Sequence, residues 1–328
     1  FCGHACVIDP DGTVQSVLAE GDGIALGEID VAKARDKRIH RGAGGDKLAD
    51  RRPDLYHAIT RNTYLWNPES FHGNYGLRPL PKGKESRIAV AQFAPVPGDI
   101  DENLEAIARL AAECNGADLI VFPAMAVTGE VFDCQHAVRL AETIPGPNVK
   151  VLQEIAREQE AHLVVGLIER DPSGALFESA VVVGPNGVAG VARKAHLTAQ
   201  DREWATPGDQ GFLTLDLPLG RVGVLIGYDA FFPEAVRSLA IDGADLIVCP
   251  SLSDWPQVIE AGDRADRFVL WRERARENKL YLAVANGAAP YGGWSGIYGP
   301  DPEDYPEEEI TIAGSDEGAV AWTIDTRN

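Results

Sequence analysis

An eight-residue segment occurs twice in the chain, and this repetition constrains the fold more than any other feature. The sequence GADLIVFP at 116–123 returns as GADLIVCP at 243–250. Each copy follows a predicted helix, and each of these helices follows an apolar run that begins with an arginine, Arg87 or Arg221. Short apolar runs joined by helices are typical of buried parallel strands with right-handed crossover connections. We therefore predict two strand–helix–strand units, related by a pseudo-twofold axis, in an α/β sandwich.

Hydrophobic periodicity places the other elements of one complete domain between residues 86 and 328. Strands are predicted at 87–93, 118–123, 162–168, 178–183, 188–193, 221–228, 245–250 and 280–285. Helices are predicted at 102–114, 148–159, 233–242 and 267–278. Helices and strands alternate over much of this region, which favours an α/β fold.

The two ends of the chain also resemble each other. The sequences IDPDG at 8–12 and EID at 28–30 correspond to YGPD at 298–301 and TID at 323–325, with an acidic turn between them in both cases. Near the start, the pattern predicts strands at 1–9, 13–19 and 23–30 and a helix at 31–41. One domain should hold one copy of this ending. We therefore expect residues 1–60 to be the C-terminal part of a preceding homologous domain, residues 61–85 to be a linker, and residues 86–328 to be the complete domain.

Charge and cysteine content limit the classes of partner. With 50 acidic and 30 basic residues the net charge is −20, so neither a nucleic acid nor an anionic membrane surface is an expected partner. No apolar run approaches the roughly 18 residues of a membrane-spanning helix. Five cysteines in 328 residues argue against a disulfide framework and for a reducing, cytoplasmic location. The chain begins at Phe1 without a visible signal peptide, and we expect it to be a piece of a longer protein.

Three ordered segments resemble the signature blocks of the nitrilase, or carbon–nitrogen hydrolase, superfamily. They are VFP at 121–123, ARKAHL at 192–197 and VLIGYDAFFPE at 224–234; DRRPDLY at 50–56 resembles the C-terminal region of some members. The resemblance spans about residues 86–328 and implies an α-β-β-α sandwich that usually dimerises through its helices. It also implies hydrolysis of small amides, nitriles or carbamoylated amines by a cysteine nucleophile, a glutamate base and a lysine. This chemistry needs no cofactor and no metal.

The resemblance maps the catalytic positions onto four residues. The lysine falls on Lys194, and a second, supporting glutamate falls on Glu203. The base glutamate, which normally follows Phe-Pro, falls on Ala124, and the nucleophilic cysteine, which normally precedes Tyr-Asp, falls on Gly227. Glycine cannot form a thioester and alanine cannot transfer a proton, so we expect nearly all chemical catalysis to be lost. Lys194 also loses a carboxylate partner, for which Glu203 is the candidate replacement.

Three other cysteines of this domain, Cys114, Cys134 and Cys249, are the alternative nucleophiles. We expect each to be a buried small hydrophobic residue. None of them stands at the strand end that the mechanism requires.

The sequence leaves three functions open. In the first, which we favour, the 86–328 domain is an inactive copy in a tandem protein and serves as the structural partner of an active upstream copy. In the second, it is a binding or regulatory module whose pocket keeps Lys194 and Glu203 and holds an anionic or amide ligand. In the third, the chain is an enzyme with a shifted site, or a deliberately inactivated amidase or nitrilase. The substrate depends on loops around the pocket, which a single sequence does not decode.

Overall fold

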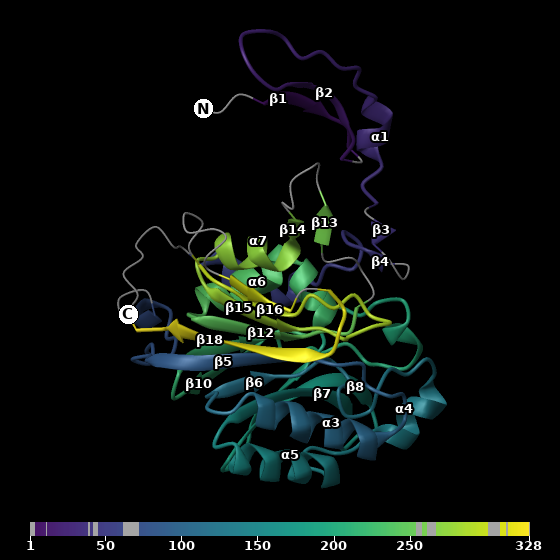
Figure 1. Cartoon of the computed structure of the whole chain (residues 1–328). Helices are drawn as coiled ribbons and strands as arrows, with labels where there is room; N and C mark the ends of the chain where they lie inside the picture. Colours follow the sequence, from purple (N-terminus) through teal and green to yellow (C-terminus); the bar gives the residue numbers. More distant parts are fainter. Residues whose placement is uncertain are drawn as a thin grey trace.

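Two six-stranded sheets pack face to face between two layers of helices in the computed structural model of the chain (Figure 1). The structure describes residues 4–10, 12–38, 40–41, 45–61, 72–253, 258–260, 267–300, 309–312 and 314–327. Because both faces of each sheet are covered, the architecture is the expected α-β-β-α sandwich.

The two sheets have the same internal arrangement. The first has the order β18 (Gly318–Asp325), β5 (Glu85–Gln92), β6 (Leu119–Val121), β7 (His162–Arg170), β8 (Leu176–Gly184) and β9 (Gly187–Arg193). The second has the order β10 (Leu213–Leu217), β11 (Gly220–Val224), β12 (Leu246–Pro250), β15 (Tyr281–Ala285), β16 (Gly296–Tyr298) and β17 (Glu309–Thr311). In both orders the second, third and fourth strands are parallel and the others are antiparallel to their neighbours. The predicted pseudo-twofold relation is confirmed.

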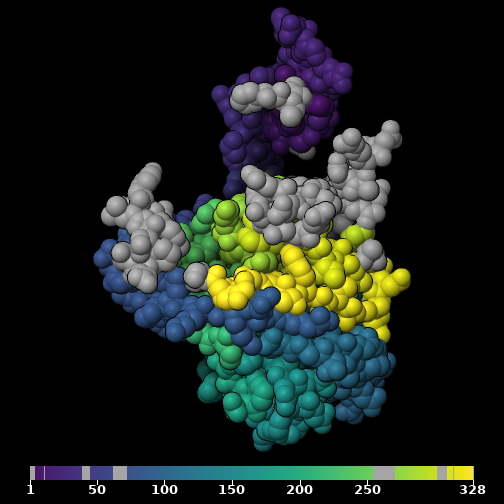
Figure 2. Space-filling model, turned by 60° about the vertical axis from the view of Figure 1, so that its left-hand side comes forward, coloured from purple at the N-terminus to yellow at the C-terminus, as the bar shows by residue number. Residues whose placement is uncertain are grey.

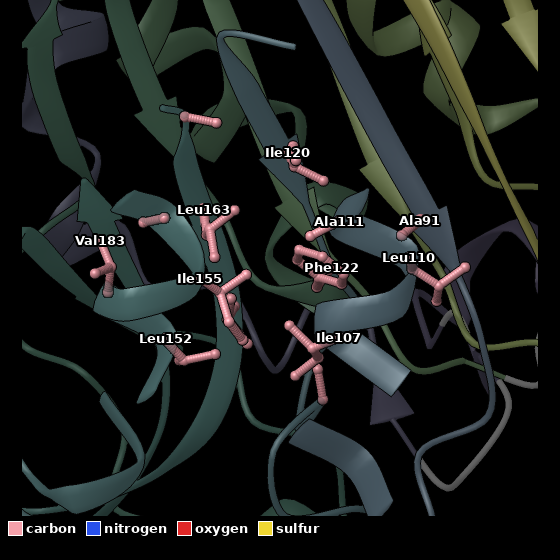
Figure 3. Close-up of a cluster of buried hydrophobic side chains, with 14 of the residues drawn as sticks. Ala91, Ile107, Leu110, Ala111, Ile120, Phe122, Leu152, Ile155, Leu163 and Val183 are labelled. Carbon is pink, nitrogen blue, oxygen red and sulfur yellow. The ribbon is translucent and has the colours of Figure 1, made fainter. Parts of the chain in front are cut away.

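Amphipathic helices cover the outer face of each sheet. The helices are α3 (Ile100–Glu113) and α5 (Pro147–Glu158) on the first sheet, and α6 (Pro233–Ile241) and α7 (Leu270–Arg276) on the second (Figure 1). Helix α3 begins where the Asp99 carboxylate accepts a hydrogen bond from the Glu102 N–H at 3.1 Å, which satisfies one of the unpaired donors of its first turn. Its fully buried Ile107 and Leu110 belong to one cluster with Phe122 of the sheet layer (Figure 3).

A second layer of aliphatic side chains fills the space between the sheets. Ile88, Val121 and Val164 of the first sheet and Leu246 and Val248 of the second are completely buried there. Because the central strands are buried on both faces, their sequences are apolar at successive positions rather than at alternate ones. This packing explains why the repeated segment GADLIV could be recognised as a buried strand in both halves.

The N-terminal arm (residues 4–35) stands off the sandwich (Figures 1 and 2). Strands β1 (Ala5–Ile8) and β2 (Val14–Leu18) form an antiparallel hairpin. Residues 23–30 run back along it, and Gln15 Nε2 donates to the Glu28 carbonyl oxygen at 2.7 Å. The predicted third strand at 23–30 is wrong for this structure, because among the described residues this segment pairs with no neighbouring strand.

Other boundaries also differ from the prediction. The helix expected at 31–41 is only α1 (Val31–Arg35), which buries no side chain, and a short exposed helix gains little from packing. The chain continues into β3 (His40–Arg41), paired with β4 (Gly45–Asp46). Helix α7 starts at Leu270 rather than at 267, because the preceding residues form β14 (Arg267–Val269), paired with β13 (Val258–Glu260).

Two further segments complete the description. Helix α4 (Cys134–Leu140), which the sequence pattern does not predict, packs beside β7. Of the predicted linker at 61–85, residues 62–71 lie outside the described residues. In the part of the chain that the structure describes, no helix has the length and apolar character needed to cross a bilayer.

Candidate active site

The two copies of the repeated segment end beside each other. Ala124 follows the first copy and Ser251 follows the second, and both residues are buried. The Ala124 N–H donates to the Ser251 carbonyl oxygen at 3.2 Å, which joins the ends of the central strands of the two sheets. The position predicted for the base glutamate therefore lies at the centre of the sandwich, at the carboxyl ends of its parallel strands.

Gly227 lies next to this junction and leaves space there. It opens the 3-10 helix η4 (Gly227–Phe231) directly beyond β11, with a φ of 45°. A Cβ atom built on Gly227 would be 3.9 Å from both the Cα and the Oγ of Ser251, and no other described atom would be as close as 4 Å. A Cβ at this position would make ordinary van der Waals contact with Ser251 and would not clash, so the missing cysteine is not explained by crowding, although the positive φ strains any side chain there.

Lys194 is buried, and its ammonium group contacts two carboxyl groups. Its Nζ donates to Glu178 Oε2 at 2.7 Å and lies 2.8 Å from Asp201 Oδ2. Glu178 comes from β8, and its carbonyl oxygen accepts the Lys194 N–H at 2.9 Å. Asp201 begins the 3-10 helix η3 (Asp201–Glu203), where its carboxylate accepts the Thr198 N–H at 2.7 Å. Strand pairing and a short capped turn thus hold both carboxylates on the lysine.

Burial and charge pairing set the ionisation of this trio. Burial raises the pKa of Glu178 to about 8, so this carboxyl group carries a proton near neutral pH. Burial alone would lower the pKa of Lys194, but attraction to Asp201 and Glu178 outweighs it and raises this pKa. Burial would likewise raise the pKa of Asp201, and the lysine lowers it instead. The trio therefore contains one positive and one negative charge and is neutral overall.

Glu203 does not take the position predicted for it beside the lysine. Its side chain is exposed at the end of η3, and the carboxylates on Lys194 are Glu178 and Asp201. The prediction of Glu203 as the replacement partner is wrong because the η3 turn directs Asp201, two residues earlier, into the interior. Among the described residues, no contact between Glu203 and Lys194 supports such a role for Glu203.

Sequence reasoning also missed Glu178 and Ser251, and each carries a recognisable signal. Glu178 is a charged residue inside a strand whose nine residues are all buried, and such a residue needs a partner of opposite charge. Ser251 occupies the position after the second repeat that Ala124 occupies after the first, so the repeat itself points to it.

Buried hydrogen bonds join the lysine loop (residues 194–200) to the Gly227 loop (residues 225–231). Asp229 Oδ1 accepts hydrogen bonds from the His196 N–H at 2.8 Å and from His196 Nδ1 at 2.7 Å. Asp229 Oδ2 accepts the Ile226 N–H at 3.2 Å. Because Nδ1 donates to the carboxylate, His196 Nε2 accepts the hydroxyl of Tyr56 at 2.6 Å, and burial raises the pKa of Tyr56 to about 12.

Tyr56 belongs to a clamp segment (residues 45–61) that docks on this site from the N-terminal side of the chain. The Arg52 guanidinium donates to the carbonyl oxygens of Ala195 and Gly208, both at 3.2 Å. Leu55 is buried and clusters with Ala195 and Tyr56. The clamp segment therefore holds the lysine loop from outside the 86–328 domain.

The alternative cysteines lie elsewhere. Cys114 and Cys249 are buried as expected, and burial raises the pKa of both thiols, that of Cys114 to about 11. Cys134 is exposed at the first residue of α4, which corrects the expectation that it is buried. A thiol with a raised pKa is a poor nucleophile because the thiolate is the reactive form.

Comparisons with known proteins show the family. The family profile described as carbon-nitrogen hydrolase matches residues 87–307. The chain is 34% identical over 244 residues to a nitrilase of Pyrococcus abyssi. The aligned region covers 70% of this chain and 89% of that protein. It is 31% identical over 237 residues to an omega-amidase of Homo sapiens. That aligned region covers 66% of this chain and 79% of that protein.

Solved structures show the same similarity. A cysteine-to-alanine variant of the Nesterenkonia AN1 amidase from the nitrilase superfamily matches with a TM-score of 0.61 and 26% identity, over 75% of this chain and 92% of that chain. A variant of the amidase from Nesterenkonia sp. AN1 matches with a TM-score of 0.63 and 25% identity, over 75% and 93%. That variant carries the acetamide moiety of fluoroacetamide covalently at its active-site cysteine.

Proposed function

The chain belongs to the carbon–nitrogen hydrolase family, and from this premise we propose that its 86–328 domain is a catalytically inactive copy that serves as the structural partner of an active one. The proposal rests on which residues stand at the ends of the central strands, where the two sheets meet. Gly227 and Ala124 stand where the family mechanism needs a thiol and a carboxylate, and both lie beside Ser251.

Loss of these two groups removes both halves of the chemistry. Without a thiolate at 227, no carbon–sulfur bond to the substrate carbon forms, and without a carboxylate at 124, no proton passes to the leaving amine. Lys194 is not left as a free charge either, because the Asp201 carboxylate and the Glu178 carboxyl group, both buried, hold it. Its ammonium group stabilises the folded domain rather than a developing charge on a substrate.

Features that serve packing are retained. The core between the sheets is buried, and the clamp segment binds the loops of Lys194 and Gly227, the latter through the Tyr228 hydroxyl, which donates to Asp50 Oδ2 at 3.3 Å, although neither loop carries a nucleophile. A domain that keeps its fold and its docking contacts but not its reactive groups fits a partner role. Catalysis on a small amide or nitrile then belongs to a homologous domain or subunit, in a reducing, cytoplasmic setting that agrees with the free Cys6, Cys114, Cys134 and Cys249.

One observation favours a second candidate, a ligand-binding copy without chemistry. The Ser251 hydroxyl and the Trp204 indole N–H are buried, and among the described residues neither finds a hydrogen-bond partner. A small carboxamide or carboxylate beside Gly227 could accept from Ser251. Binding of propionamide or propionate, measured by NMR titration and lost in Ser251→Ala, would support this candidate over the purely structural role.

Covalent trapping tests the main proposal. Fluoroacetamide is applied to the chain and to Gly227→Cys, both with Cys6 and Cys134 replaced by serine, and the adducts are mapped by peptide mass spectrometry. We expect no adduct on the unsubstituted site and one on residue 227 of the variant. An adduct on Ser251 or Cys249 would reveal a native nucleophile and overturn the proposal, and an unmodified Gly227→Cys would remove residue 227 from the nucleophile position.

A further inference from the structure

Among the described residues, no side chain of the N-terminal arm is buried, and the chain itself contains a template for the partner that would bury them. We propose that residues 4–30 are the closing strands of a second nitrilase-type domain that precedes the 86–328 domain in the same polypeptide. The proposal rests on the proposed function, because it identifies the homologous partner as a neighbour in the chain.

The correspondence between the two ends of the chain holds residue by residue. Residues 23–30, GIALGEID, match β18 (Gly318–Asp325), GAVAWTID, in length, in the first glycine and in the final Ile-Asp. Residues 6–8 match β16 (Gly296–Tyr298); in each case a proline stands two residues after the segment and an aspartate follows the proline. Both β1–β2 and β16–β17 are antiparallel pairs.

Corresponding side chains of the N-terminal arm and of the C-terminal strands differ in their exposed fractions. Ile324 is 1% exposed in the core between the sheets, whereas its counterpart Ile29 is 75% exposed. Tyr298 is 1% exposed, and its counterpart Ile8 is 55% exposed. Leu26, at the position of Ala321, is 79% exposed. The arm therefore presents Ile8 and Ile29 to solvent at positions that its homologous segment buries, and exposed apolar groups of this kind mark an interaction surface.

The homologous segment shows which strands the missing partner must supply. β18 pairs along its whole length with β5, and β16 pairs with β15. The arm accordingly lacks a β5-like strand against residues 23–30 and a β15-like strand against β1. A two-stranded hairpin is marginally stable by itself, so two additional sheet edges would stabilise it strongly.

Chain order decides where the partner lies. The strands that the arm resembles are the last of the fold, so the other strands of that domain precede them in the polypeptide. A second copy of this chain is a poor source, because its own β5 and β15 are already paired with β18 and β16. The partner therefore lies on the N-terminal side of the arm.

The clamp segment shows how the two domains meet. It follows the arm, and its contacts reach the helix layer as well as the lysine loop. Arg51 pairs with Glu234 of α6 at 2.8 Å, and Arg61 pairs with Asp242 at the end of the same helix. In Figure 1 the arm lies beyond the α6 and α7 layer. The tail of the preceding domain thus crosses onto α6 of this one, which places that domain on this face.

Hydrogen exchange of the arm tests the inference. Amide exchange is measured by mass spectrometry for residues 23–30 in chain 1–328 and in the complete polypeptide that contains it, with residues 318–325 as the internal control. We expect the 318–325 amides to be protected in both proteins. We expect the 23–30 amides to exchange at nearly intrinsic rates in chain 1–328 and at least about 100-fold more slowly in the complete polypeptide.

Unprotected 23–30 amides in the complete polypeptide would overturn the inference. Protection in chain 1–328 that rises with protein concentration, with a dimer in light scattering, would overturn it in favour of a second copy. A matched pair of variants checks the register: Ile29→Asp should leave the melting temperature of chain 1–328 unchanged and abolish arm protection in the complete polypeptide, whereas Ile324→Asp should unfold the 86–328 domain. These readouts do not depend on hydrolysis, so a catalytically active 86–328 domain would defeat the proposed function alone.

Discussion

Replacement of Glu178 by glutamine should change the pH dependence of stability in a defined direction. Burial raises the pKa of this carboxyl group from an ordinary 4.5 to about 8 in the folded chain. A group whose folded pKa is raised contributes stability that is fully present below the unfolded pKa and is lost as pH rises through the folded pKa. Here the contribution is complete below about pH 4.5 and disappears as pH rises through 8.

The size of the effect follows from the same two values. One pKa unit corresponds to about 1.4 kcal/mol, so the contribution of Glu178 should fall by roughly 2–3 kcal/mol between pH 6 and pH 9. The amide introduced by Glu178→Gln would keep an oxygen for the Lys194 ammonium but cannot ionise. In this variant the loss over the same interval should therefore shrink to less than about 1 kcal/mol.

Urea denaturation followed by tryptophan fluorescence at pH 6, 7, 8 and 9 measures this difference. Glu203→Gln is the matched control, because that side chain is exposed and makes no contact with Lys194. The control should lose as much stability as the unsubstituted chain. An equal alkaline loss in Glu178→Gln, or a cost above about 2 kcal/mol for this variant already at pH 6, would show that Glu178 is ionised in the folded protein and would refute the reasoning.

Three further substitutions have defined outcomes in the same denaturation assay. Lys194→Met should destabilise the chain by about 3–5 kcal/mol at pH 7, because it leaves Asp201 buried without its cation; a cost below about 1 kcal/mol would mean that water reaches the trio. Tyr56→Phe should cost about 1–2 kcal/mol through the lost hydrogen bond to His196, and no cost would show that the clamp segment is not docked in solution. Ser251→Ala should cost less than about 0.5 kcal/mol or stabilise the chain, because the buried hydroxyl has no partner among the described residues; a larger cost would reveal a partner.

The fold could be predicted from the sequence because its two halves repeat the same buried strand. Successive apolar residues at 119–121 and 246–248 require cover on both faces, and a layered α/β sandwich supplies it. The prediction of a third strand at 23–30 was wrong for the opposite reason. Its pattern is that of a strand, but pairing requires a neighbour that the pattern of the segment itself cannot provide.

The sequence predicted which positions form the site, but it did not predict which residues contact one another there. Gly227 and Ala124 could be located from their neighbours along the chain, and the structure brings both beside Ser251. The partner of Lys194 could not be chosen in this way. Glu178 reaches it through antiparallel pairing of two strands, and Asp201 through the direction of a single 3-10 turn, whereas linear spacing favoured Glu203.

Ammonia release by purified chain 1–328 across a panel of small amides, nitriles and carbamoylated amines tests the central claim most directly. A nitrilase-family amidase assayed in parallel fixes the sensitivity, and Ser251→Ala and Cys249→Ala identify any native nucleophile. We expect no release above the background of the buffer for any compound. Release that either substitution abolishes would mean that the domain keeps a working nucleophile despite Gly227, and would contradict the account.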